Sequence, residues 1–150
     1  DTAQTAWKGR LYFLYSGTVA VVLDVRNFAS SGSDGYTTTT GSNGQAYSYR
    51  YTGGSDDAGG VEQDADGESG TFTVTVGLDP RYQVERVDFT GDIESQLSWA
   101  AGPSPRIAVI TDSDTSTGNG AYAVIVKDTT ANCTLPCDPP IKNKPVGQTK

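Results

Sequence analysis

Histidine is absent from this 150-residue chain, and so are methionine and any long apolar run. Without histidine, the chain lacks the commonest general base, proton shuttle and transition-metal ligand of proteins. The longest apolar stretch, residues 19–23, is far shorter than the roughly 20 residues that a membrane-spanning helix requires. These absences argue against most enzyme classes and against a membrane span.

Cysteine is scarce as well, because only Cys133 and Cys137 are present. Two thiolates without a histidine cannot complete a tetrahedral zinc site, and the three-residue spacing is not that of a redox motif. A turn at Pro136 would let the two sulfurs close a small loop in an oxidising compartment. A structural Cys133–Cys137 disulfide is therefore favoured over free thiols, and with it an extracellular or periplasmic location.

Basic residues are fewer than acidic ones, 11 against 18, and the net charge is −7. This balance disfavours nucleic acid and anionic lipid as partners. The length suits one domain, 1–150, with an N-terminal arm at 1–6 and an extended C-terminal tail at 138–150. A chain that begins at Asp1 without methionine is expected to be either a processed mature form or a trimmed one.

Short alternating runs rich in threonine and valine are what the chain does contain, and residues 71–76 are the clearest. Further strands are expected at 7–15, 18–26, 46–52, 81–90, 106–111 and 120–128, with a short strand or turn at 93–99. We predict an all-β fold, an antiparallel two-sheet sandwich of the Ig-like kind with about seven to nine strands. Its predicted core includes Val21, Leu23, Phe72, Val74, Val76, Val124 and Val126.

Two irregularities interrupt this pattern. The alternation changes phase within 81–90, which indicates a β-bulge near Glu85–Arg86. Long polar loops are expected near 29–44 and 53–70, the first with a frayed edge hairpin as the alternative.

The loop at 53–70 carries six acidic residues and no basic one. Asp64, Asp66 and Glu68 resemble the opening of a calcium loop, in which alternate acids surround the ion. The remaining ligands of that signature are missing. A solvated acidic loop is therefore favoured, and these three residues are the candidate calcium ligands.

Tyr47, Tyr49 and Tyr51 share one face of their expected strand. An exposed row of this kind could stack against sugar rings, whereas a buried row would fill the core or pair across strands. Core packing is the favoured interpretation, and it would leave Ser48 and Arg50 facing water.

From about Gly77 onward, the order of motifs is similar to a small bacterial family. The segments are 110–115, 122–126, Asp128-Thr129, Cys137-Asp-Pro139 and 141–145. They resemble the DP-EP family, short β-sandwiches whose last strand pair ends in similar Asp-Pro and Ile-x-Asn sequences. The likeness covers roughly half of the chain. The N-terminal half is longer than that family would lead one to expect and does not match it. It implies a sandwich fold and no active site, since the role of that family is unknown.

Three functions remain open. A carboxylate-only hydrolase would need a pair such as Glu85 with Asp88 or Asp92 with Glu94, but neighbouring acids at strand ends are usually solvated. The favoured hypothesis is a non-enzymatic, secreted structural protein without a cofactor, a self-associating subunit of an extracellular fibre or surface structure. The alternative is a carbohydrate-binding or adhesive module that uses the tyrosines, with or without calcium.

Overall fold

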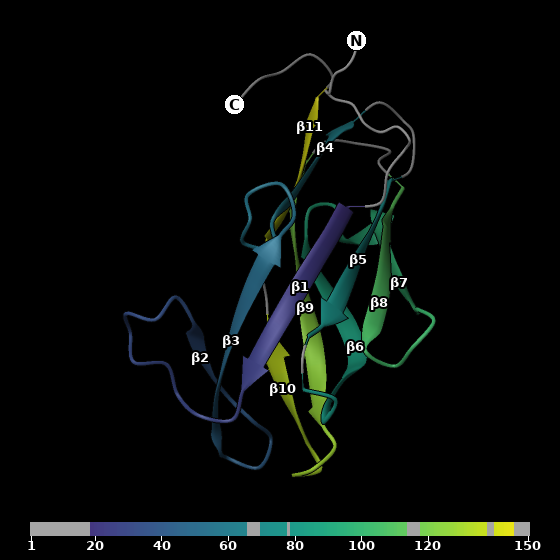
Figure 1. Ribbon diagram of the computed structural model, residues 1–150. Helices are drawn as coiled ribbons and strands as arrows, with labels where there is room; N and C mark the ends of the chain where they lie inside the picture. The colour runs from purple at the N-terminus through teal and green to yellow at the C-terminus, as the bar shows by residue number, and fades with distance from the viewer. Residues whose placement is uncertain (1–18, 66–69, 78, 114–117, 138–139, 146–150) are drawn as a thin grey trace.

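The computed structural model describes residues 19–65, 70–77, 79–113, 118–137 and 140–145, and these form an almost entirely β structure (Figure 1). One turn of 3-10 helix, Glu94–Gln96, interrupts the strands. The strands are β1 (Val19–Arg26), β2 (Thr37–Thr40), β3 (Ala46–Gly53), β4 (Val61–Ala65), β5 (Gly70–Val76), β6 (Tyr82–Gly91), β7 (Leu97–Ala101), β8 (Ile107–Asp112), β9 (Gly118–Asp128), β10 (Cys133–Cys137) and β11 (Pro140–Pro145).

The strands form two sheets, which confirms the predicted all-β sandwich. Sheet A has the order β2-β3-β1-β5-β8-β7. Sheet B has the order β10-β9-β11-β4, and β6 also pairs with β9. Strands β10 and β11 follow one another along β9, since they pair with its C-terminal and N-terminal parts respectively.

Two neighbouring pairs are parallel, β1 with β5 and β4 with β11, so the sheets are not purely antiparallel as predicted. In sheet A the parallel pair arises because β1 runs through the middle of the sheet, between β3 and β5. A strand that is apolar on both faces at its centre suits this interior position. The chain returns to β5 only after β2, β3 and β4, and such a long connection is what a parallel pair requires.

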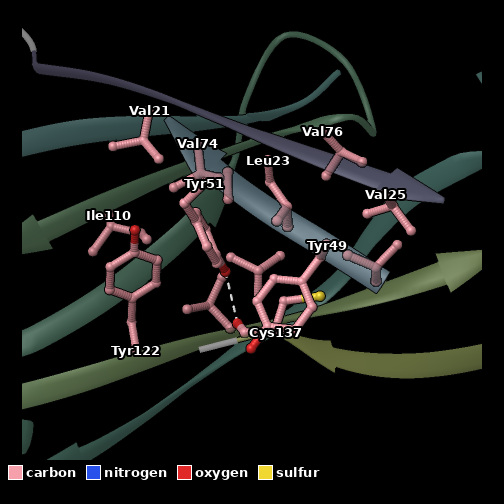
Figure 2. Packing of buried hydrophobic residues seen from close by; sticks show 14 of the residues in the cluster. Val21, Leu23, Val25, Tyr49, Tyr51, Val74, Val76, Ile110, Tyr122 and Cys137 are labelled. Carbon is pink, nitrogen blue, oxygen red and sulfur yellow. Dashed lines mark hydrogen bonds between the residues drawn. The ribbon is translucent and has the colours of Figure 1, made fainter. Parts of the chain in front are cut away.

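One core fills the space between the sheets, and Figure 2 shows its side chains converging from both of them. The alternation of β1, β5 and β9 turns every second side chain inward. The predicted core is confirmed, because all of its members are buried: Val21, Leu23, Phe72, Val74, Val76, Val124 and Val126.

The predicted bulge is also confirmed. Strand β6 pairs with β9 on both sides of a register shift between Val84 and Arg86, which leaves Glu85 as the extra residue. Tyr82 and Val87 are both buried although they differ in phase. One extra residue in a strand would turn the following side chains to the opposite face. The bulge takes up that residue, so the side chains on both sides of it still point into the core.

Two short strands lie inside the segments predicted to be loops. Strand β2 pairs with β3, and β4 pairs with β11. Both are polar in sequence, and edge strands tolerate polar residues because only one of their edges is paired. Part of the predicted C-terminal tail is strand β11 of sheet B.

The strand predicted at 7–15 lies outside the described residues, as do the arm at 1–6 and Trp7. No helix in the described part of the chain combines the length and apolar character needed to cross a membrane.

Candidate functional site

The tyrosine row of β3 belongs to the core. Tyr47, Tyr49 and Tyr51 are all buried, so the core interpretation is confirmed and the exposed sugar-binding row is wrong. The Tyr51 hydroxyl donates a hydrogen bond of 2.6 Å to the backbone oxygen of Cys137, drawn as a dashed line in Figure 2. Its ring also makes an edge-to-face contact with Tyr122, with centroids 5.8 Å apart. Burial and backbone hydrogen bonding make this row a structural link between the two sheets.

Ser48 is buried too, which corrects the expectation that it faces water. Its hydroxyl accepts a hydrogen bond of 2.9 Å from Arg26 Nε, so the arginine side chain covers it on the outer face of sheet A. Arg50 is exposed, as predicted.

The two cysteines are not bonded to each other, so the predicted disulfide is wrong. Both lie in β10, and both are buried. An extended strand separates residues four apart by about 13 Å, whereas a disulfide needs Cα atoms within about 7 Å. Pro136 does not turn the chain but pairs with Ile125 of β9. Among the described residues, β9 is the only strand that β10 pairs with, so β10 is an edge strand, where proline is tolerated.

Asp128, at the end of β9, is the centre of a buried polar cluster. Its carboxylate accepts two hydrogen bonds from Arg81, of 2.9 and 2.7 Å, and one of 2.7 Å from the Tyr47 hydroxyl. The backbone N–H groups of Thr130 and Ala131 donate to the same carboxylate, which closes the turn between β9 and β10. We call Arg81, Tyr47, Asp128 and Cys133 the Asp128 cluster.

The surroundings of Asp128 and Tyr47 fix the protonation states of these two side chains. Burial alone would raise the pKa of Asp128, but the hydrogen bonds from Arg81 and then Tyr47 outweigh it and hold that pKa well below its usual range. Burial, followed by the contacts with Cys133 and Asp128, raises the pKa of Tyr47. Because the Tyr47 proton goes to Asp128, the Cys133 thiol is the donor across the 3.2 Å contact between Sγ and Oη. Asp128 therefore stays charged and Tyr47 stays protonated near neutral pH, so the contacts between them are structural.

A second polar cluster lies where β1 leaves sheet A. The Arg26 guanidinium is stacked on two aromatic rings, 4.5 Å from the Phe28 centroid and 3.5 Å from that of Tyr36. It forms an ion pair of 2.6 Å with Asp34, and the Tyr36 hydroxyl donates to Asp24. We call Arg26, Phe28, Asp34 and Tyr36 the arginine stack. It fixes the loop 27–36 against the outer face of β1 and β3.

Two of the three candidate calcium ligands fall outside the described part of the chain. Asp66 and Glu68 lie outside the described residues, and only the backbone of Asp64 is described, in β4. Within the described part of the chain, no group of three or more acidic or cysteine side chains could hold a metal ion. The carboxylates considered for hydrolysis, Glu85, Asp88, Asp92 and Glu94, are all exposed.

The edges of the sheets differ in how they are protected against pairing with another chain. Strand β6 carries the bulge and an exposed ion pair of 3.0 Å between Arg86 and Asp88, two devices that protect an edge. Strand β7 has neither, because its sequence is Leu-Ser-Trp-Ala-Ala. Ser98, Ala100 and Ala101 are exposed, and no described strand pairs with its other side.

Part of the outer face of sheet A beside β7 carries no charge. The outward residues of β7, β8 and β5, the first two of β1 and Thr52 of β3 lie in register next to one another, and the charged Asp24 and Arg26 lie further along β1. We call this surface the neutral face, and its members are Ala20, Val22, Thr52, Thr71, Thr73, Thr75, Ser98, Ala100, Ile107, Val109 and Thr111. In a chain of net charge −7, it is a surface where a second negatively charged copy meets little local repulsion.

Sequence reasoning missed the Asp128 cluster, the arginine stack and the β7 edge. The sequence Asp128-Thr-Thr-Ala held a usable signal, because aspartate followed by small polar residues is typical of a turn that the carboxylate closes. Nothing in sequence indicated that Arg81 would reach it. Two comparisons with known proteins add no relative: no protein-family model matches the chain, and no curated protein sequence matches it.

Proposed function

We propose that this protein is a non-enzymatic structural subunit that associates with copies of itself, outside the cell, in a fibre or surface structure. The observation that carries the proposal is the edge of β7, which has no charge and no bulge and leaves Ser98, Ala100 and Ala101 exposed. Natural sheets usually protect such an edge, because its free backbone groups can pair with another strand.

The contact that follows is an antiparallel pairing of β7 from two copies, which would join two copies of sheet A into one continuous sheet. Such a contact is two-fold symmetric, because each copy offers the same strand. It would close as a dimer if it were the only contact. The neutral face supplies a second one, since uncharged faces of two sheets can pack against each other. Alternating these two contacts would extend the assembly.

The functional groups of the described chain support a structural role. The Asp128 cluster and the arginine stack use their charged groups to fix a turn and a loop. The resemblance to DP-EP sandwiches stays a prediction and adds no activity to the proposal.

The test is a charge placed on the β7 edge. Ala100→Lys adds a cation to an exposed position of β7, and Thr90→Lys adds the same charge to an exposed position of β6. Sedimentation velocity at increasing protein concentration should show association of the wild type and of Thr90→Lys, with Ala100→Lys remaining monomeric. Negative-stain electron microscopy then shows whether the associated material is ordered.

The proposal fails if the wild type stays monomeric at high concentration. It fails as well if Ala100→Lys associates as strongly as the wild type, because the contact would then lie elsewhere.

A further inference from the structure

Phe28 is an exposed aromatic ring that the fold holds in a fixed place. It is 54% exposed, and it is the only aromatic among the exposed large hydrophobic residues of the described chain. An isolated phenylalanine on a loop normally gains by turning toward the core. Here the loop 27–36 instead keeps the ring on the surface, against the charged group of Arg26.

The support beneath the ring is rigid. Asp34 binds the Arg26 guanidinium at 2.6 Å, Ser48 accepts from its Nε at 2.9 Å, and Tyr36 stacks on it at 3.5 Å. Three partners therefore fix the plane on which Phe28 rests. A ring whose position is fixed before binding loses little conformational entropy when a ligand stacks on it.

Two exposed hydroxyl groups lie further along the same loop, three and five residues after Phe28. Ser31 and Ser33 are exposed, with their oxygens 3.4 Å apart. Gly32 has φ +92°, and nothing lies within 4 Å of the position that a side chain would take there, so the loop is open on that side. The charges of Arg26 and Asp34 cancel in their ion pair.

These features favour one class of ligand. A pyranose ring has an apolar face of C–H groups that stacks on an aromatic ring, and hydroxyls at its rim that pair with serine side chains. An apolar peptide would need neighbouring apolar side chains, and residues 29–33 are Ala-Ser-Ser-Gly-Ser. An anionic polymer would be repelled by the net charge of −7.

We propose that Phe28, held by the arginine stack on a loop that also exposes Ser31 and Ser33, is a binding platform for a neutral saccharide. The site is distinct from the core tyrosines. It also lies away from β7, because β2 and β7 are the opposite edges of sheet A (Figure 1). Copies assembled through β7 would therefore present several platforms, and their avidity would exceed the affinity of one site.

The test is affinity electrophoresis in native gels that contain soluble neutral polysaccharides (hydroxyethylcellulose, xylan, laminarin, galactomannan), together with pull-down on cellulose and chitin. Retardation of the wild type by at least one member of this panel is expected. Phe28→Ala should weaken the retardation at least tenfold, whereas Phe28→Trp should preserve it. Val19→Ala, which trims another exposed apolar side chain of sheet A, is the matched control and should bind as the wild type does.

Phe28→Leu separates binding from support, because leucine still packs on Arg26 but has no aromatic face. A variant that unfolds at the wild-type temperature and no longer binds would support the platform. The proposal is overturned if the wild type binds nothing in the panel, or if Phe28→Ala or Phe28→Leu binds like the wild type. Ala100→Lys should bind saccharide as a monomer, so failure of the assembly and failure of the platform are distinguishable.

Discussion

Asp128 is the residue on which the end of the sandwich depends most, because its buried carboxylate has five described donors. Removing one member of a buried ion pair costs about 3–5 kcal/mol, since the partner is left without compensation. We therefore expect Asp128→Ala to lower the free energy of unfolding by about 3 kcal/mol in urea titrations. Asp88→Ala, which removes an exposed ion pair with Arg86, should change it by less than about 1 kcal/mol. Equal effects would contradict the structural role of the Asp128 cluster.

The same carboxylate predicts how stability depends on pH. Its pKa is lowered in the folded state, whereas an unfolded aspartate has a pKa near 3.9. Below about pH 4 the unfolded chain therefore takes up a proton that the folded chain does not, and acid favours unfolding. The stability difference between the wild type and Asp128→Asn should be constant from pH 7 to about pH 5 and shrink as the pH falls further. A difference that grows in acid would contradict the assignment.

The thiols give a direct test of β10. Cys133 and Cys137 face the core from one extended strand, so both should be reduced thiols that are protected from solvent. Without any reductant, a thiol reagent should modify both cysteines in denaturant and neither in the native protein. A chain two mass units lighter before reduction would show that a disulfide forms after all.

At the scale of elements, the β6 bulge can be removed by deleting one residue. Glu85 is unpaired while the pairs on both sides of it are regular, so its deletion should leave Val87 and Phe89 on the inner face. Deleting Asp88 should instead turn Phe89 outward, because a shift of one residue reverses the faces of a strand. Near-UV circular dichroism and thermal unfolding should be close to wild type for the first deletion and lost for the second. Equal losses would contradict the bulge.

The strands that sequence could predict are those whose own alternation settles which face is buried. Residues 71–76 and 120–128 are examples, since threonine or alanine alternates there with buried valine or an aromatic residue. Strands β2, β4 and β10 could not be predicted in this way, because what makes them strands is a partner distant in the chain. The Cys133–Cys137 prediction failed for this reason: pairing with β9 extends a segment that Pro136 alone would have turned.

The candidate sites were less predictable than the strands. Tyr47 and Asp128 are 81 residues apart in the chain, and Arg81 is 47 residues from Asp128. The alternation of β3 predicts only that Ser48 faces away from the core, and it was therefore expected to be exposed. The side chain that covers it, Arg26, comes from another strand. Contacts of this kind depend on sheet order, which composition and periodicity do not give.

For the whole molecule, the net charge of −7 disfavours association between copies, whereas the neutral face favours it. Copies repel at long range, and this repulsion is screened by salt over about 10 Å at 0.1 M ionic strength. Salt does not weaken a contact made by the β7 edge, because that edge carries no charge to be screened. Association should therefore strengthen from 20 mM to 500 mM sodium chloride, and again as the pH falls from 7 toward the pI near 4.4.

Sedimentation velocity across this salt series measures the effect, with Ala100→Lys as the control that should stay monomeric throughout. The charge of that variant is −6, since one lysine is added to −7, so its long-range repulsion is slightly weaker than that of the wild type. Loss of its association would consequently be due to the β7 edge itself. If salt instead dissolves the wild-type assembly, ion pairs hold the copies together, and the charged edges of β6 or β4 become the interface to examine.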